Sequence, residues 1–245
     1  SHTNFTVLLA HTLSWANAWG AEWRNEVQLG DRKKLMTEWH QPLGAGSQWY
    51  VRPNLTFATE PFDVYLDSKG KKPEGSFSVE SVDASLAFGR DFGRWGTGSL
   101  MAGWSHSQIR RNSGILDGRG KVKTWYAGAA FAVDTLEDSG WPRKGYKGQI
   151  QVKRTFGHND LGIPNEVVYE AAFLKPIALS KEWTLTRAAN AGRSMLPGFT
   201  MGGVFNLSGS PYGRWNGNRS LMGQAMLYRA LSPSLEMLGM PVYAG

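Results

Sequence analysis

The stretch that decides the fold is Gln48-Trp49-Tyr50-Val51-Arg52-Pro53-Asn54-Leu55-Thr56-Phe57. Apolar and polar residues alternate along it with a period of two, so an extended strand would have one apolar and one polar face. The same alternation recurs in about a dozen segments, and no long segment carries the apolar stripe of an amphipathic helix. The sequence therefore predicts an all-β fold of antiparallel strands.

The composition excludes several other classes of protein. Glycine accounts for 30 of 245 residues and charged residues for 19%, which is not typical of a disordered chain or a coiled coil. The chain contains no Cys, so it has no disulfide framework and no thiolate metal site. No apolar stretch approaches the ~20 residues that a membrane-spanning helix needs.

Two all-β architectures fit the alternation. In a soluble β-sandwich the apolar faces pack together, whereas in an outer-membrane barrel they meet lipid and the polar faces line a wet lumen. The strongly charged polar face favours the barrel. The residues predicted to face the lumen are Glu22, Arg24, Glu26, Arg52 and Lys153.

Aromatic residues recur near the ends of the segments, as the interfacial girdles of a membrane barrel require. The predicted girdle residues are Trp15, Trp19, Trp49, Tyr50, Trp95, Trp141, Tyr146 and Trp183. Long and short connections also alternate. The long ones, which we expect on the extracellular side, cover residues 66–77, 112–120, 157–164 and 194–219. The run 134–145 is an exception, a long connection on the periplasmic side.

No pattern of catalytic, metal-binding or cofactor-binding residues is present in the sequence. The stretch nearest to the Gly-x-Ser-x-Gly elbow of a serine hydrolase, residues 209–213, has Pro211 at the nucleophile position. The five histidines are scattered without metal-ligand spacing. The basic residues are spread along the chain, so no nucleic-acid partner is expected. Loop bases such as Arg110, Arg111 and Arg119 could meet anionic lipopolysaccharide.

Two motifs resemble those of the bacterial surface-antigen barrel superfamily. Residues 199–209, Phe-Thr-Met-Gly-Gly-Val-Phe-Asn-Leu-Ser-Gly, resemble its sixth extracellular loop, which folds back into the barrel. The residues that carry this inward-folding loop motif are Gly202, Gly203, Asn206, Leu207, Ser208 and Gly209. Residues 134–145 look like a periplasmic turn of the superfamily, through Asp134, Thr135, Trp141, Pro142 and Gly145.

Within the superfamily, residues 20–30 and Asn206-Leu207-Ser208-Gly209 are most similar to the patatin-like phospholipase autotransporters, the type Vd secretion proteins. Assembly and two-partner secretion members usually carry Arg in the Arg-Gly-aromatic tip of the loop, where Ser208-Gly209-Ser210 stands here. Ser208 cannot make the charge-assisted contact of that Arg, which argues against an assembly role. The patatin branch would itself be expected to have an aromatic residue at Ser210.

The resemblance implies that residues 1–245 form a single outer-membrane β-barrel domain. Of the family's 16 strands about 12 would be represented, the first and last being absent together with the upstream patatin and POTRA-type domains. The implied function is a translocator or anchor barrel in the bacterial outer membrane, which displays or secretes its upstream patatin-type lipase domain. The chain itself would not be an enzyme and would have no cofactor.

The expected partners are outer-membrane lipid and lipopolysaccharide, the upstream passenger domain, and the outer-membrane assembly machinery. Two alternatives stay open from the sequence. One is another transporter or assembly barrel of the same superfamily. The other is a soluble β-sandwich that binds glycans through exposed Trp.

Overall fold

The computed structural model describes residues 6–30, 32–64, 75–114, 120–138, 141–159, 165–194, 199–201, 215–230 and 243–244. Within these ranges the chain forms β-strands and one short 3-10 helix, η1 (Gly93–Trp95). The first strands are β1 (Thr6–Leu13), β2 (Glu22–Gly30), β3 (Lys33–Pro42), β4 (Trp49–Val64), β5 (Gly75–Asp91), β6 (Thr97–Gly114) and β7 (Gly120–Asp134). They are followed by β8 (Lys147–Asn159), β9 (Val167–Ala178), β10 (Trp183–Arg193), β11 (Phe199–Met201), β12 (Trp215–Gly217), β13 (Arg219–Ala230) and β14 (Tyr243–Ala244).

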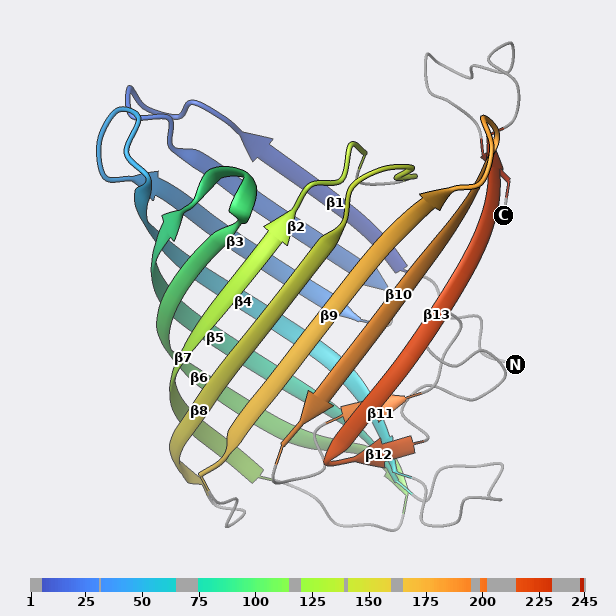
Figure 1. The fold of residues 1–245 in the computed structure, drawn as a ribbon. Helices are drawn as coiled ribbons and strands as arrows, with labels where there is room; N and C mark the ends of the chain where they lie inside the picture. Colours follow the sequence, from blue (N-terminus) through green and yellow to red (C-terminus); the bar gives the residue numbers. More distant parts are fainter. Residues whose placement is uncertain are drawn as a thin grey trace.

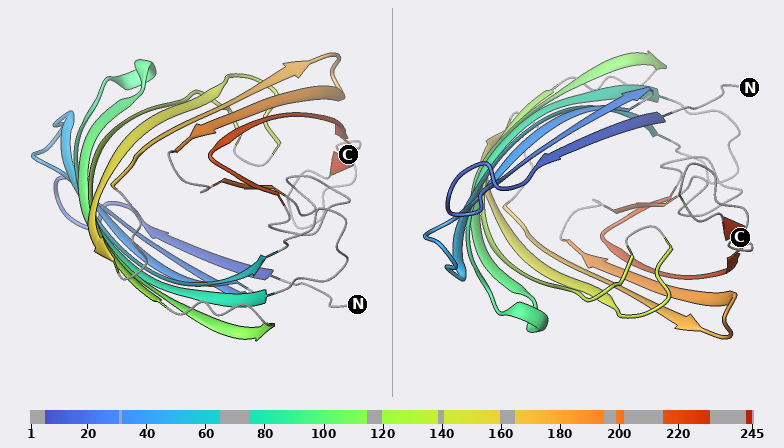
Figure 2. Two further views of the ribbon diagram at one scale, coloured as in Figure 1. Left: turned by 90° about the horizontal axis from the view of Figure 1, so that it is seen from below. Right: turned by 90° about the horizontal axis from the view of Figure 1, so that it is seen from above.

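Twelve of these strands form one antiparallel sheet in the order β1 to β10, then β13 and β14 (Figure 1). Figure 2 shows that the sheet curves into an open barrel wall, with its first and last strands on either side of the gap. The predicted antiparallel barrel with about 12 strands is confirmed. The β-sandwich alternative is wrong, because the long strands pair continuously in a single sheet instead of facing one another in two. Among the described residues, no helix is long and apolar enough to cross a membrane.

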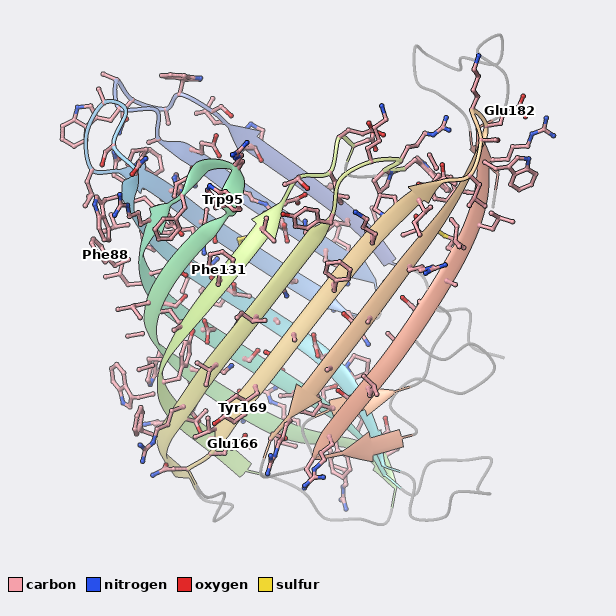
Figure 3. All side chains as sticks on the ribbon, in the orientation of Figure 1. Phe88, Trp95, Phe131, Glu166, Tyr169 and Glu182 are labelled. Carbon is pink, nitrogen blue, oxygen red and sulfur yellow. The ribbon has the colours of Figure 1, made fainter. Side chains whose placement is uncertain are left out.

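The strand register gives the sheet one apolar face. Leu55 pairs with Ala84 and Phe57 with Val82, while Trp49 stacks on Phe88 with ring centroids 5.2 Å apart. Figure 3 shows Phe88 on the convex side of the sheet. Large apolar side chains along this side are exposed, up to 78% for Leu221, as suits a surface that meets lipid and not water.

The girdle residues divide between the two faces. Trp15, Trp19, Trp49, Trp95 and Trp183 are exposed near the end of the barrel that carries the short turns. Tyr50 is 4% exposed, and its ring lies 4.5 Å from that of His40 on the concave face, so its assignment to the girdle is wrong. The period of two explains this, because Tyr50 directly follows an outward residue and must point inward. The assignment of Trp141 is wrong as well, because its ring packs against the buried ring of Tyr228.

The connections at the two ends of the barrel differ in length. One end carries the turns 14–21, 43–48, 92–96, 135–146 and 179–182. The other end carries the two-residue connection 31–32, but also the longest connection between strands of the main sheet, residues 194–218 between β10 and β13. We assign the first end to the periplasm, because the longest connections of a membrane barrel lie on the extracellular side. At the other end several strands reach into the predicted loops. β5 begins at Gly75, β6 ends at Gly114 and β8 ends at Asn159, because antiparallel pairing continues past the apolar belt.

Candidate functional site

The long periplasmic turn between β7 and β8 is closed at its base by backbone and side-chain bonds. The Thr135 amide donates to the Tyr146 carbonyl at 2.9 Å, and the Tyr146 amide donates to the Thr135 hydroxyl at 2.9 Å. Asp134 and Lys147, which pair at the start of the turn, form an ion pair of 2.8 Å. These bonds hold the two ends of the turn together, as in the last residue pairs of a β-hairpin.

Gly145 allows the chain to return to β8. Its φ is +89°, a conformation that residues with a Cβ adopt only at a cost. A Cβ at this position would also overlap the backbone of Thr135 and Leu136. The glycine of the predicted turn motif therefore has a geometric role, in conformation and in close packing.

The tip of the turn packs against a strand that is 86 residues away in the sequence. The Tyr228 hydroxyl on β13 donates a hydrogen bond to the Pro142 carbonyl, and Trp141 meets the Tyr228 ring edge-on at 5.1 Å. Tyr228 is fully buried and Pro142 is buried. Thr186 of β10 also donates to the Tyr228 hydroxyl, at 3.5 Å.

Arg143 ties the same turn to the neighbouring hairpin. Its guanidinium donates to the carbonyls of Ser180 and Lys181, both in the turn between β9 and β10. β8, β9, β10 and β13 are successive neighbours in the sheet, so the 135–146 turn reaches across three strand spacings. Because Tyr228 and Thr186 lie on the concave face, the turn folds inward at the periplasmic end of the barrel.

The predicted lumen residues share the face opposite to the apolar belt. Glu26 pairs with Arg24 and accepts from Lys34 at 2.9 Å. Its pairing partner in the register is Met36, a buried residue of the concave face. The Glu26–Lys34 pair joins β2 to β3 inside the barrel, whereas Arg24 and Glu26 both lie on β2.

The other three predicted lumen residues lie along the same face. Glu22 is opposite His40, and Arg52 lies 3.6 Å from Glu38. Lys153 stands over the Tyr126 ring at 5.2 Å, and the Tyr126 hydroxyl donates to Asp83 at 2.9 Å. The interior is thus a band of charged side chains and aromatic rings, as a polar lumen requires.

The strands that flank the predicted inward loop lie inside the barrel. β11 and β12 pair with each other and run along the concave side of the main sheet (Figure 2). Phe199 lies so close to Gly192 of β10 that a Cβ there would overlap its ring. The motif residues Gly202, Gly203, Asn206, Leu207, Ser208 and Gly209 lie outside the described residues.

The structure adds residues that the sequence analysis did not single out. Tyr228 and Arg143 make the contacts that carry the turn across the barrel. One signal for Tyr228 is present in the sequence. The alternation along its strand places this side chain on the inward face, near the periplasmic end. No group of three or more metal-ligating side chains occurs in the part of the chain that the structure describes.

Comparison with known proteins gives a match in structure and none in sequence. No protein-family model and no curated protein matches the chain. The chain is similar to the crystal structure of BamA from Haemophilus ducreyi lacking POTRA domains 1–3, with a TM-score of 0.65 and 13% identity. The match covers 95% of this chain and 51% of that one, so the chain spans about half the length of that protein.

At this identity the likeness concerns the fold, and it agrees with the exposed apolar belt and the polar concave face. The chain therefore has a β-barrel fold similar to that of BamA, and this fold indicates a bacterial outer-membrane protein.

Proposed function

We propose that this chain is the translocator barrel of a patatin-type autotransporter, which anchors and displays an upstream lipase domain. The observation that carries the proposal is the position of β11 and β12 on the concave side, with Phe199 against Gly192. These two strands flank residues 202–214, which contain Asn206-Leu207-Ser208-Gly209, the motif similar to the patatin branch.

The charges inside the barrel support a passage for polypeptide. Glu26, Glu38 and Asp83 are each paired with a cation or a hydroxyl group, so the concave face is polar without a large excess of either sign. A face of this kind offers hydrogen-bonding groups to a passing chain and binds no single sequence strongly. The 135–146 turn would narrow the periplasmic entrance.

We also propose that residues 1–245 do not hydrolyse esters. The sequence has no nucleophile elbow, since its nearest match, residues 209–213, has Pro211 at the nucleophile position. Lipid-ester hydrolysis by a purified sample of residues 1–245, surviving substitution of Ser210, would contradict this part of the proposal.

The proposal is tested on the whole natural polypeptide, with an epitope tag in the region upstream of Ser1. In intact cells we expect the tag to be accessible to antibody and to added protease. Deleting the 206–216 segment should reduce surface exposure of the tag while the barrel remains in the membrane fraction. A tag that stays inaccessible in the unaltered protein would overturn the proposal.

The alternative is a barrel of the same superfamily that transports or assembles separate substrates. The likeness to BamA favours it only at the level of the fold. It predicts that removing the protein lowers the amounts of other outer-membrane barrels. The autotransporter proposal predicts that those amounts are unchanged and that only the protein's own passenger is lost from the surface.

A further inference from the structure

The outer face of the barrel carries two cations directly opposite each other near the periplasmic edge of the apolar belt. Lys175 of β9 pairs in register with Arg187 of β10, and both side chains are exposed. Both side chains lie on the lipid-facing side of their strands. Their neighbours on that side are Phe173 on β9 and Ala189 on β10. Like charges at directly opposed positions of a sheet destabilise it, so an anion bound between the two side chains would offset the repulsion.

The described residues supply no carboxylate for this pair. No Asp or Glu occupies an outward position of β8, β9, β10 or β13 within the described ranges. The acid at the nearby turn, Glu182, binds Arg229 at 2.6 Å (Figure 3). Lys175 also faces the Tyr146 ring, with its ammonium group 5.6 Å from the ring centroid.

An apolar hollow adjoins the two cations on the same face. Its part nearest to them has a volume of about 350 Å³ and is lined by Phe173, Ala189 and Leu221. It continues into a second part of about 530 Å³, where Ala171 and Ala191 are shared lining residues. Phe131 and Ile150 line both parts of the hollow together with these small residues.

The hollow runs along the strands away from the cations, toward the extracellular end. Phe173 and Ala189 are each two residues from the cations, and Ala171 and Ala191 are four residues away, about 13 Å along the strand. Lys and Arg side chains extend toward the membrane surface when their backbone lies at the edge of the apolar layer. The arrangement thus presents positive charge at the periplasmic edge and an apolar channel beneath it.

We propose that this outer surface binds an anionic glycerophospholipid of the periplasmic leaflet. The lipid phosphate would lie between Lys175 and Arg187, and one acyl chain would fill the hollow over Ala171 and Ala191. Basic pockets at the membrane surface bind anionic lipid headgroups in this manner. Lipopolysaccharide does not fit, because the cations lie toward the end with short turns. The site is independent of any passenger domain.

The test uses the full-length protein, purified in non-ionic detergent and depleted of lipid. Native mass spectrometry then measures retention of added phosphatidylglycerol, with phosphatidylcholine and inorganic phosphate as separate additions. We expect phosphatidylglycerol to be retained at least about tenfold more strongly than phosphatidylcholine. Inorganic phosphate should not compete at equal concentration.

Two sets of variants separate the roles of charge and shape. The double variant K175Q/R187Q should lose the preference for phosphatidylglycerol. The variant A171F, which fills the hollow and keeps both cations, should weaken its retention several-fold. The control R154Q removes an outward cation on β8 that stands over Phe156 at 5.3 Å, and it should behave like the unaltered protein.

Each variant is first checked for the faster gel migration of an unheated barrel. Equal retention of phosphatidylglycerol and phosphatidylcholine by the unaltered protein would overturn the proposal. So would full retention by folded K175Q/R187Q, or competition by inorganic phosphate, which would assign the cations to a soluble anion.

Discussion

The hydroxyl of Tyr228 on β13 donates a hydrogen bond to the carbonyl of Pro142, in the turn between β7 and β8. Both residues are buried, and Trp141 packs edge-on against the same tyrosine ring. A turn that belongs to one hairpin is therefore held by a strand three positions further along the sheet. This contact closes part of the periplasmic end from inside and holds β13 to the rest of the wall.

Replacing Tyr228 by Phe should destabilise the barrel by about 1–3 kcal/mol, because the buried Pro142 carbonyl loses its donor. Urea unfolding of the full-length protein in lipid vesicles measures the difference. The control is Y169F, at an outward tyrosine that is 52% exposed, where a change within about 0.5 kcal/mol is expected. Equal unfolding midpoints for Y228F and the unaltered protein would show that the contact contributes nothing.

Replacing Gly145 by Ala should cost more than replacing Gly46 by Ala. Both glycines have positive φ, +89° and +68°, and an Ala in this conformation costs roughly 1–2 kcal/mol. Only at Gly145 would the new Cβ also overlap backbone, since no atom lies within 4 Å of the Cβ position at Gly46. The same unfolding assay compares the two variants, and a larger loss for G46A would contradict the packing of the turn.

Arg introduced at Leu55 should destabilise the barrel by ~2–4 kcal/mol if the site lies near the middle of the membrane. Arg at the adjacent Asn54 should be tolerated, because that side chain points to the polar interior, where Asn54 pairs in register with Glu38. Unfolding in vesicles and the fraction of heat-modifiable protein on gels report the effect. A similar loss of stability in both variants would mean that lipid does not contact the Leu55 face in preference to the Asn54 face.

Deleting residues 206–216 should raise the single-channel conductance in planar bilayers. β11 and β12 lie on the concave side, so we expect the residues between them to occupy part of the lumen. The deletion also removes Trp215 and Asn216 of β12. A deletion of similar length in the 65–74 connection, between β4 and β5, serves as the control and should leave conductance unchanged. An unaltered conductance for a folded 206–216 deletion would place that segment outside the pore.

The complete protein should need detergent or membrane to stay folded, and it should migrate faster on a gel unheated than boiled. The reason is the exposed outer belt, on which Leu100, Ile150 and Leu221 are 65%, 60% and 78% exposed. Size-exclusion chromatography without detergent checks the first expectation. A monodisperse monomer in that experiment would contradict a lipid-facing belt.

Much of the wall could be predicted from the sequence, because a strand's two faces follow from a period of two. The alternation at 48–57 correctly divided Leu55 and Phe57 from Arg52 and Asn54. The motif at 134–145 marked a special turn through Asp134 and Gly145. The prediction of Tyr50 as a girdle residue is wrong because it rests on the aromatic side chain, whereas the alternation from Trp49 places Tyr50 on the inward face.

The local pattern could not determine contacts between distant strands, because these depend on the register and curvature of every strand in between. Alternation says that Tyr228 and Lys175 face opposite sides, but not that Tyr228 meets Pro142 or that Lys175 stands opposite Arg187. Those neighbours follow from how each hairpin is staggered against the next, and from a bend that brings a turn across three strands. The sequence by itself determined the strands, their faces and the apolar belt. Only the tertiary structure decided the inward turn, the place of β11 and β12, and the paired cations beside the hollow, because pairing register and sheet curvature are set by long-range contacts.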